Sequence, residues 1–348
     1  MTAAPTAAVW EGPDVVRPAH LPAPEVPDGW ALLDVACNGI CGSDLSILHG
    51  THPRAAAPLV MGHEVSGWVA RAGATGPREG ALVAVEPLIS CGRCRACRTG
   101  AAHVCSRLGL FGIDAPGGLA TQLAVPPDRL HELPGTVDPR TAALVEPLAV
   151  AVHAVSLSGM ERGDVVSVQG AGPIGLLTAL VARAEGAGTV VVTEPGPWRR
   201  EVARGFGLRV AADGEELTAV LDELTGGEGA DTTFDTAAHP SVAARLSSTT
   251  RVLGRVVVVG VYKQPTPLDL QGVCFREQSL QGVRVYTSAD VRRAVQLVAD
   301  DALGLAAFPT TVFALADVAR AFDAAASGSD CLKVLVTPRP ELLEDRTA

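Results

Sequence analysis

One stretch of this sequence fixes the kind of sheet that the middle of the chain can form. From Val165 it reads VVSVQG, then a glycine-rich turn, then LLTALVARAEG and TVVVTE, in the order apolar strand, turn, apolar helix and apolar strand. A helical crossover returns the chain to the same end of a sheet, so the two strands lie parallel. The later apolar strands TTFDT and RVVVVGV continue the pattern. The sequence therefore predicts an α/β fold built on a parallel sheet.

The turn in this stretch, GAGPIG, has the spacing G-x-G-x-x-G. Gly170 allows a tight turn, Gly172 lets the backbone approach a pyrophosphate, and Gly175 lets the helix pack closely on the strand. The helix that opens at Pro173 and Ile174 offers its unpaired N–H groups to an anion. The motif in this context predicts a dinucleotide site, and a structural glycine turn without a nucleotide is the alternative.

An acidic residue at the end of the next strand favours one dinucleotide over another. Glu194 lies nineteen residues after Gly175, where a carboxylate accepts hydrogen bonds from both ribose hydroxyls and repels a 2′-phosphate. Arg199 could attract that phosphate, but beside Glu194 we expect it to lie against the adenine ring. Thr236, at the end of a later strand, is a further candidate contact, or else a strand-end hydroxyl. NAD is therefore predicted ahead of NADP.

Composition excludes several classes of partner. The 348 residues are 47% hydrophobic and 19% charged, which is typical of a globular protein with a substantial core. The net charge of −10 argues against nucleic acid, because phosphate binding needs clustered positive charge. No stretch is apolar for long enough to span a membrane, and the N-terminus lacks a secretion pattern. We expect a cytoplasmic protein acting on a small molecule.

Four cysteines in CGRCRACRTGAAHVC have the spacing of a tetrahedral zinc site. Two, two and seven residues separate Cys91, Cys94, Cys97 and Cys105, so one loop can place four thiolates around one metal. Such a site has no open position for water or substrate. The zinc predicted here is therefore structural.

A second cluster has the chemistry of a catalytic metal site. Cys41 lies in NGICGSDLSILHG, and His63 and Glu64 follow in MGHEVSG, beginning twenty-two residues later. Thiolate, imidazole and carboxylate are the side chains that zinc accepts, and three protein ligands leave one position open for an exchangeable group. Taken singly, each motif is also compatible with an ordinary core cysteine or a surface turn. Together the two clusters predict about two zinc ions per chain.

These motifs, in this order, resemble the zinc-containing medium-chain alcohol dehydrogenase superfamily. The resemblance rests on CGSD, GHE, the four-cysteine loop, VEPLAVAVHA and GAGPIG, covers nearly the whole chain, and is greatest for the polyol branch of sorbitol, butanediol and threonine dehydrogenases. It implies a GroES-like, β-rich catalytic domain at residues 1–148 and 286–348, interrupted by a Rossmann domain at residues 149–285.

The resemblance also assigns roles to single residues. Cys41, His63 and Glu64 correspond to the zinc ligands, and Glu146 to an acidic residue that binds zinc directly or through water. Ser43 corresponds to the hydroxyl that takes the substrate's proton. The next relay position, usually histidine, is Ser46 here, and His49 is a candidate substitute, whereas His52 has no motif support.

The function implied is oxidation of a secondary alcohol, on a polyol, sugar, cyclitol or amino alcohol, by reversible hydride transfer to NAD. Two alternatives are an NADP-linked carbonyl reductase of the same fold and a non-enzymatic zinc- and nucleotide-binding scaffold. A homodimer or homotetramer is also implied, paired through a sheet edge for which the apolar strand VVVVGV, residues 256–261, is the candidate.

Overall fold

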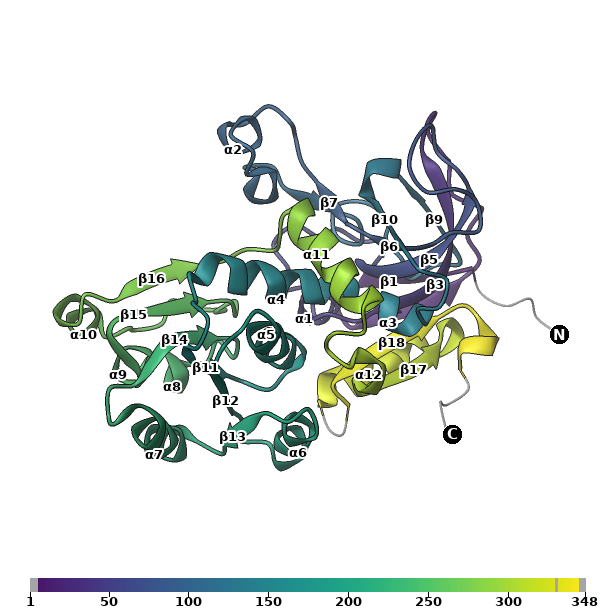
Figure 1. The fold of residues 1–348 in the computed structure, drawn as a ribbon. Helices are drawn as coiled ribbons and strands as arrows, with labels where there is room; N and C mark the ends of the chain where they lie inside the picture. The colour runs from purple at the N-terminus through teal and green to yellow at the C-terminus, as the bar shows by residue number, and fades with distance from the viewer. Residues whose placement is uncertain (1–5, 329–330, 344–348) are drawn as a thin grey trace. The chain divides into compact units, whose positions relative to one another are not determined.

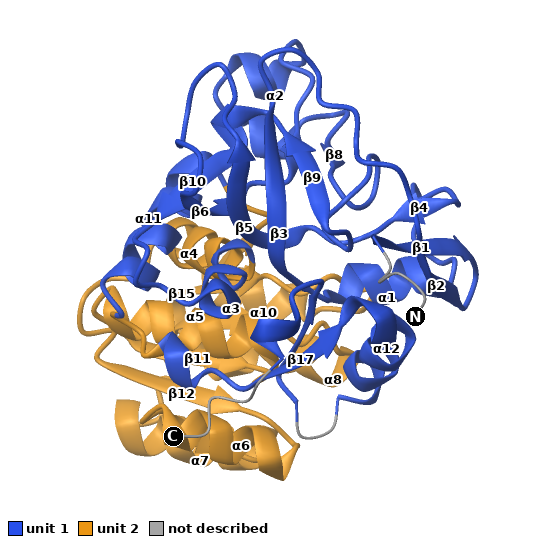
Figure 2. Ribbon diagram, turned by 90° about the vertical axis from the view of Figure 1, so that its right-hand side faces the viewer, with its two compact units in different colours: residues 1–146, 287–301, 305–348 blue, residues 147–286, 302–304 orange. Residues whose placement is uncertain are grey.

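The structure, a computed structural model, describes residues 6–328 and 331–343. The chain divides into two compact units (Figure 2). Unit 1 comprises residues 1–146, 287–301 and 305–348, and unit 2 comprises residues 147–286 and 302–304. No helix within the described ranges is both long and apolar enough to cross a membrane.

Unit 1 is built from β-sheets. Its largest sheet has the order β10-β6-β5-β3-β18-β17, with β9 also paired to β3, and two smaller sheets have the orders β2-β1-β4 and β7-β8. The strands are β1 (Ala7–Gly12), β2 (Val15–Ala19), β3 (Ala31–Gly39), β4 (Leu59–Val60), β5 (Glu64–Arg71), β6 (Leu82–Val85), β7 (Leu88–Ile89), β8 (Gly109–Leu110), β9 (Gln122–Val125), β10 (Leu130–Leu133), β17 (Thr310–Ala314) and β18 (Lys333–Thr337).

The core of the large sheet follows the two-residue period of its strands. Ala31, Leu33 and Val35 alternate along β3, so they share one face, and all three are buried. They pack with apolar residues of the neighbouring strands, among them Val65 of β5 and Val83 of β6. β3 lies in the middle of the sheet and is hydrogen-bonded to β5 on one side and to β18 on the other, which fixes its position.

Unit 1 also contains helices, three of them short. The helices of unit 1 are α1 (Gly42–Leu48), α2 (Arg95–Arg98), α3 (Pro139–Ala142), α11 (Ser288–Ala299) and α12 (Val318–Ser327). A further helix, α4 (Val145–Ser158), begins in unit 1 and continues into unit 2. The two long C-terminal helices arise where the sequence has apolar residues at helical spacing, and Thr287 caps α11 by accepting from Asp290 N.

A buried carboxylate joins three segments of unit 1. Glu86 is 2% exposed and accepts hydrogen bonds from Arg129 Nη1 at 2.5 Å, His131 Nε2 at 3.0 Å and Ser288 Oγ at 2.9 Å. Burial on its own raises the pKa of Glu86, but the bond from His131 and the charge of Arg129 outweigh it and lower the pKa from 4.5. The folded state therefore favours the ionised form.

We expect Glu86→Gln to destabilise the protein in a pH-dependent way. Because the folded pKa of Glu86 is lowered, its contribution is complete above about pH 4.5 and is lost as the pH falls through the folded pKa. At pH 7 the variant should lose about 1–3 kcal/mol, the usual effect of removing a charged hydrogen-bond partner. Thermal unfolding from pH 7 down to about pH 3, which covers the region below 4.5, measures the difference between variant and wild type. A difference that stays constant over this range would contradict the role given to Glu86.

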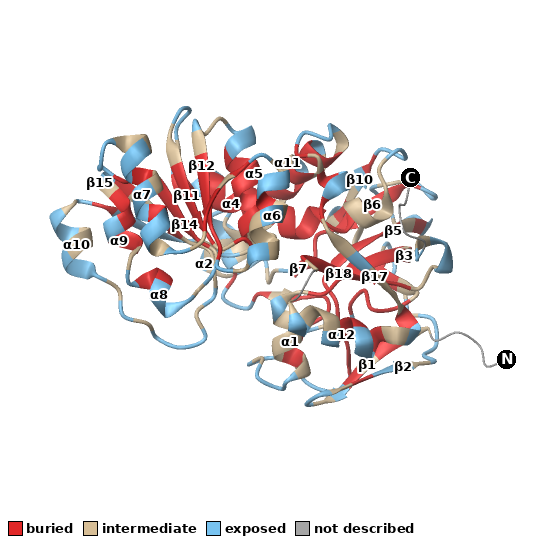
Figure 3. Ribbon diagram, turned by 90° about the horizontal axis from the view of Figure 1, so that it is seen from below, coloured by how far each residue is buried: buried red, intermediate tan, exposed pale blue. Residues whose placement is uncertain are grey.

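Unit 2 is a parallel sheet of order β13-β12-β11-β14-β15-β16, in which every neighbouring pair is parallel (Figure 1). Its strands are β11 (Val165–Gln169), β12 (Thr189–Thr193), β13 (Arg209–Ala211), β14 (Ala230–Asp235), β15 (Thr250–Val258) and β16 (Ser279–Gly282). The central strands are largely buried (Figure 3), which explains their continuous apolar sequence. The predicted parallel α/β sheet is confirmed.

Helices follow each of the first five strands of this sheet. They are α5 (Pro173–Ala184), α6 (Pro197–Gly205), α7 (Gly214–Thr225), α8 (Pro240–Ala243), α9 (Leu246–Thr249) and α10 (Leu270–Phe275). The strand order, in which the sheet grows first to one side of β11 and then to the other, is that of a dinucleotide-binding fold.

The prediction that residues 256–261 provide a free sheet edge is wrong. Val256, Val257 and Val258 belong to β15, which pairs with β14 on one side and with β16 on the other. The edge on this side is the short strand β16, whose four residues are all exposed. The apolar pattern of β15 reflects burial between two neighbours, and periodicity alone does not separate a buried interior strand from an apolar edge.

Candidate functional site

Strand pairing brings Cys41 and His63 together. β3 and β5 are antiparallel with Gly39 opposite Glu64, so Cys41, two residues after β3, and His63, just before β5, lie at the same end of the sheet. Cys41 is the N-cap of α1, and its backbone N–H donates to Asp44 Oδ2 at 2.9 Å. The pairing of β3 with β5 therefore fixes the segment that carries His63, and the N-cap of α1 fixes Cys41.

Cys41, His63 and Glu64 form a compact ligand cluster. One ligand atom from each lies within 4.8 Å of the others, and His63 and Glu64 are 4% and 1% exposed. Sulfur, imidazole nitrogen and carboxylate oxygen together form a donor set that suits zinc. The residues present therefore fit a zinc ion with three protein ligands.

Asp44 lies at ion-pair distance from His63, and our sequence reasoning missed it. Its carboxylate is fully buried, and Oδ1 lies 3.6 Å from His63 Nδ1, while His63 Nε2 lies 3.4 Å from Ser43 Oγ. Burial on its own lowers the pKa of His63, but Asp44 and Cys41 raise it well above 6.5. A carboxylate on the second ring nitrogen is the usual support of a metal-binding histidine. The signal available in the sequence was an acidic residue in the first turn after Cys41.

Lys333 is the second residue that sequence reasoning missed. Its Nζ lies 2.5 Å from Glu64 Oε1 and 2.9 Å from the carbonyl oxygen of Ile40, and the residue is 4% exposed. Burial on its own lowers the pKa of Lys333, but Glu64, Cys41 and Glu146 raise it above 10.5, so the amine stays charged. Lysine occurs only twice in the sequence, at 263 and 333, and this rarity was the available signal.

The close approach of Lys333 and Glu64 depends on a glycine. A Cβ atom at Gly39 would lie 1.9 Å from Glu64 Oε2 and 2.8 Å from Lys333 Cε. Both distances are far below van der Waals contact, and Glu64 and Lys333 are buried and cannot move aside freely. Gly39 is therefore required for the packing of the cluster.

Glu146 lies near this cluster but not in its compact part. It is 7% exposed in the first turn of α4, and its charge acts on Lys333. Among the described residues, the group with ligand atoms within 4.8 Å comprises Cys41, His63 and Glu64 without Glu146. Binding of zinc by Glu146 stays a prediction.

The candidate proton relay is only partly assembled. Ser43 Oγ lies beside His63, as a proton acceptor next to the metal must. Ser46 Oγ donates to the Gly42 carbonyl at 3.1 Å, within its own helix. His49 Nδ1 lies 2.6 Å from Asp14 Oδ1, and its side chain is 54% exposed. This geometry gives no support to a relay through His49.

The four cysteines converge in a separate cluster. The sulfur of Cys94 lies 3.4 Å from that of Cys97 and 3.9 Å from that of Cys105, and Cys91 Sγ lies 4.0 Å from Cys97 Sγ. Backbone N–H groups point at the sulfurs, and those of Cys97 and Ser106 lower the pKa of Cys94 to about 5. A closed set of four thiols with N–H donors around it fits a structural zinc ion.

The glycine-rich turn in unit 2 has the geometry that its motif predicts. Gly170 has φ +112°, and Gly172 is the N-cap of α5 with Pro173 at its first position. A Cβ atom at Gly175 would lie 1.9 Å from the Gly170 carbonyl oxygen. Thr236 Oγ1 donates to the Gln169 carbonyl at 2.9 Å, so it braces the start of this turn.

Glu194 is held at the end of β12 by two backbone amides. Oε2 accepts from Ala171 N at 2.9 Å, and Oε1 accepts from Gly196 N at 2.8 Å. Each carboxylate oxygen has a second lone pair, which leaves acceptor capacity for ribose hydroxyls. Arg199 lies in the first turn of α6, while the neighbouring Arg200 donates to the Glu194 carbonyl at 2.9 Å.

Comparison with known proteins identifies the family. Residues 27–135 match the alcohol dehydrogenase GroES-like domain, and residues 173–300 match the zinc-binding dehydrogenase domain. The chain is 39% identical to a 2-dehydro-3-deoxy-L-galactonate 5-dehydrogenase of Pseudoalteromonas atlantica, over 91% of this chain and 93% of that protein. It is 33% identical to an L-threonine 3-dehydrogenase of Bacillus subtilis, over 92% and 94%.

Solved structures agree with this identification. One, described as a zinc-binding dehydrogenase from Sinorhizobium meliloti 1021 bound to NADP, superposes with a TM-score of 0.90 at 30% identity, covering 97% of this chain and all of that one. A 2R,3R-butanediol dehydrogenase from Bacillus subtilis has a TM-score of 0.88 at 27% identity, with 96% and 99% covered. The predicted GroES-like and Rossmann folds are confirmed, and the chain belongs to the zinc-containing medium-chain alcohol dehydrogenase superfamily.

Proposed function

We propose that this chain oxidises a secondary alcohol on a polyol, sugar acid or related compound, and that it transfers the hydride reversibly to NAD. The observation that carries this proposal is the cluster of Cys41, His63 and Glu64 beside the hydroxyl of Ser43. Three ligands of different chemistry with a proton acceptor at their side suit an alcohol dehydrogenase. The relatives named for sugar-acid and threonine dehydrogenation support this substrate range.

The roles of the residues follow from their positions. When bound, zinc supplies a positive charge that favours ionisation of an alcohol, and NAD supplies the hydride acceptor. Ser43 would accept the alcohol's proton, and Asp44, which lies beside His63 Nδ1, would leave His63 Nε2 available to hold the zinc ion. In unit 2, the N-terminus of α5 binds the pyrophosphate, and Glu194 accepts from the adenosine ribose.

Domain roles, oligomeric state and location complete the proposal. Unit 1 is the catalytic domain and unit 2 the NAD-binding domain. We propose a homodimer or homotetramer that pairs through the exposed edge strand β16, where Leu280 is 45% exposed and Phe275, just before it, is 80% exposed. We also propose a cytoplasmic location, because metal-binding thiols stay reduced there.

NADP is the alternative cofactor, because a solved relative at 30% identity is described as bound to it. Glu194 favours NAD, since its carboxylate repels a 2′-phosphate.

The test is a panel of polyols, sugar acids, cyclitols and amino alcohols offered with NAD or NADP to protein of measured zinc content. We expect about two zinc ions per chain and reduction of NAD by secondary alcohols. A higher kcat/KM with NADP would overturn the cofactor assignment. Absence of turnover at full zinc occupancy would favour the non-enzymatic scaffold.

A further inference from the structure

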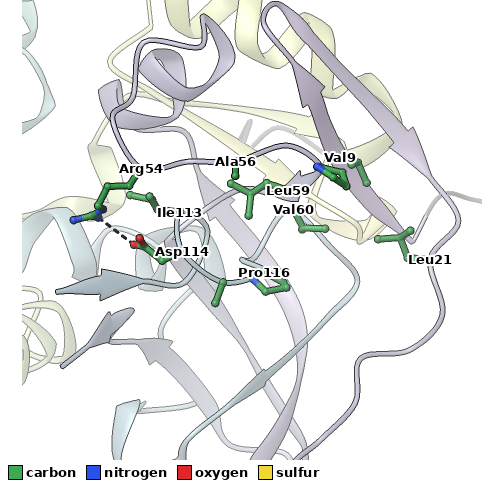
Figure 4. Close-up of a pocket in the computed structure, with 11 residues that line it drawn as sticks. Val9, Leu21, Arg54, Ala56, Leu59, Val60, Ile113, Asp114 and Pro116 are labelled. Carbon is green, nitrogen blue, oxygen red and sulfur yellow. Dashed lines mark hydrogen bonds and ion pairs between the residues drawn. The ribbon is translucent and has the colours of Figure 1, made fainter. Parts of the chain in front are cut away.

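Unit 1 contains a pocket with one charged pair at one end (Figure 4). Its volume is about 530 Å³, and its walls come mainly from residues 54–60 and 113–116. The remainder of the lining is apolar, with Val9, Leu59 and Val60 on one side and Pro116 on another. Arg54 and Asp114 are therefore the groups that can recognise a polar ligand there.

The pair offers donors and acceptors side by side. Arg54 Nη2 donates to Asp114 Oδ2 at 3.1 Å, and the two side chains are 35% and 29% exposed. The same Oδ2 accepts from Leu110 N at 2.9 Å, which fixes the orientation of the carboxylate. Oδ1 takes part in neither bond, and the single contact uses one of the five N–H groups of the guanidinium.

The pocket wall is fastened to the segment that carries His63. Val60 precedes His63 by three residues, so their Cα atoms are at most about 11 Å apart. Next to the other wall, Gly117, which follows Pro116, packs so closely on this segment that a Cβ atom would lie 2.1 Å from the Gly62 carbonyl oxygen. The pocket walls and the segment that carries His63 are therefore packed tightly together.

His52 lies next to the loop that carries Arg54. Its Nδ1 accepts from Arg54 N at 3.4 Å and from Ala55 N at 3.3 Å. Burial and the charge of Arg54 lower the pKa of His52, and the charges of Asp44 and His63 also act on it. Groups of the pocket and of the metal cluster thus lie within electrostatic range of the same imidazole.

We infer that Arg54 and Asp114 determine specificity by binding adjacent hydroxyl groups of the substrate, remote from the reacting carbon. The pair is neutral as a whole, so a ligand that both donates and accepts is favoured over an anion, which Asp114 repels. Two neighbouring hydroxyls can donate to Asp114 Oδ1 and accept from Arg54. The inference rests on the proposed alcohol dehydrogenase activity and narrows its substrate to polyhydroxylated chains.

The experiment compares Arg54→Met and Asp114→Asn with the wild type, using zinc-loaded full-length protein. Arg17→Met is the matched control, because Arg17 forms an exposed ion pair with Glu11 at 3.6 Å. The substrates are the hexitol oxidised fastest among sorbitol, galactitol and mannitol, the hexonate D-gluconate, and propan-2-ol, which lacks a second hydroxyl. The shift in thermal midpoint caused by the hexitol measures binding independently of turnover.

We expect kcat/KM for the hexitol and the hexonate to fall about 10- to 100-fold in both variants, the usual effect of losing a hydrogen bond to a charged group. Propan-2-ol and the control should stay within about twofold of wild type, and the stabilisation by hexitol should disappear in both variants. An equal fall with propan-2-ol would show a structural role and overturn the inference. So would a loss in Arg54→Met confined to the hexonate, which indicates carboxylate recognition. If the wild type oxidises no alcohol, the proposed function itself fails.

Discussion

We expect Cys41→Ser to abolish NAD reduction and to leave NAD binding unchanged. The serine hydroxyl is a poor zinc ligand compared with a thiolate, so the cluster with His63 and Glu64 loses its sulfur donor. The proposed NAD site consists of groups of unit 2, such as the N-terminus of α5, and Cys41 belongs to unit 1. We expect turnover to fall by about a factor of a thousand or more, the scale of losing electrostatic stabilisation at the reacting oxygen. Steady-state kinetics and NAD titration by fluorescence measure the two effects.

Cys97→Ser is the matched control for this variant. It also removes one sulfur from a zinc cluster, but from the closed set of four cysteines. Metal analysis should show the loss of about one zinc ion per chain in either variant. Cys97→Ser should lower the unfolding temperature, or disturb assembly, before it slows hydride transfer. A stable, fully assembled Cys97→Ser protein with a slowed chemical step, or an active Cys41→Ser protein, would show that the two metal assignments are reversed.

Lys333→Met should destabilise the metal-free protein strongly. It leaves the carboxylate of Glu64, which is 1% exposed, without its cation. Breaking a buried ion pair from one side costs about 3–5 kcal/mol, which corresponds to a shift in thermal midpoint on the order of 10 °C. With zinc added, the loss should be smaller, since zinc places positive charge beside the same carboxylate.

Lys333→Arg is the control, because it keeps the charge in a longer side chain. Thermal unfolding of both variants, after chelation and again after zinc is restored, separates the roles. An equal loss with and without zinc would mean that Lys333 acts by packing alone, and a stable Lys333→Met protein would remove it from the cluster.

The features predicted correctly from sequence are those encoded over short distances. The turn at Gly170, Gly172 and Gly175 is fixed by backbone sterics within six residues, so its motif predicts its geometry. The four cysteines converge because one loop carries them all. Cys41 and His63 are brought together by the register of β3 and β5, which no local pattern predicts. They were paired in the sequence because thiolate and imidazole are both side chains that bind zinc.

The features that were missed depend on long-range pairing. Lys333 reaches Glu64 because β18 lies beside β3 in the sheet, and nothing near residue 333 in the sequence indicates this neighbour. The position of β15 inside its sheet likewise depends on β16, a four-residue strand of weak pattern. Arg54 and Asp114, sixty residues apart, meet only through the folding of two loops.

Because Lys333 is buried, chemical labelling of its amine can measure the unfolding of unit 1. Of the two lysine side chains, Lys263 is exposed and Lys333 is 4% exposed. A reagent that acylates amines will therefore label Lys263 at once and reach Lys333 only when β18 separates from β3. The ratio of the two labels, read by mass spectrometry, follows the opening of unit 1 in a mixture or a cell extract, with no engineered probe.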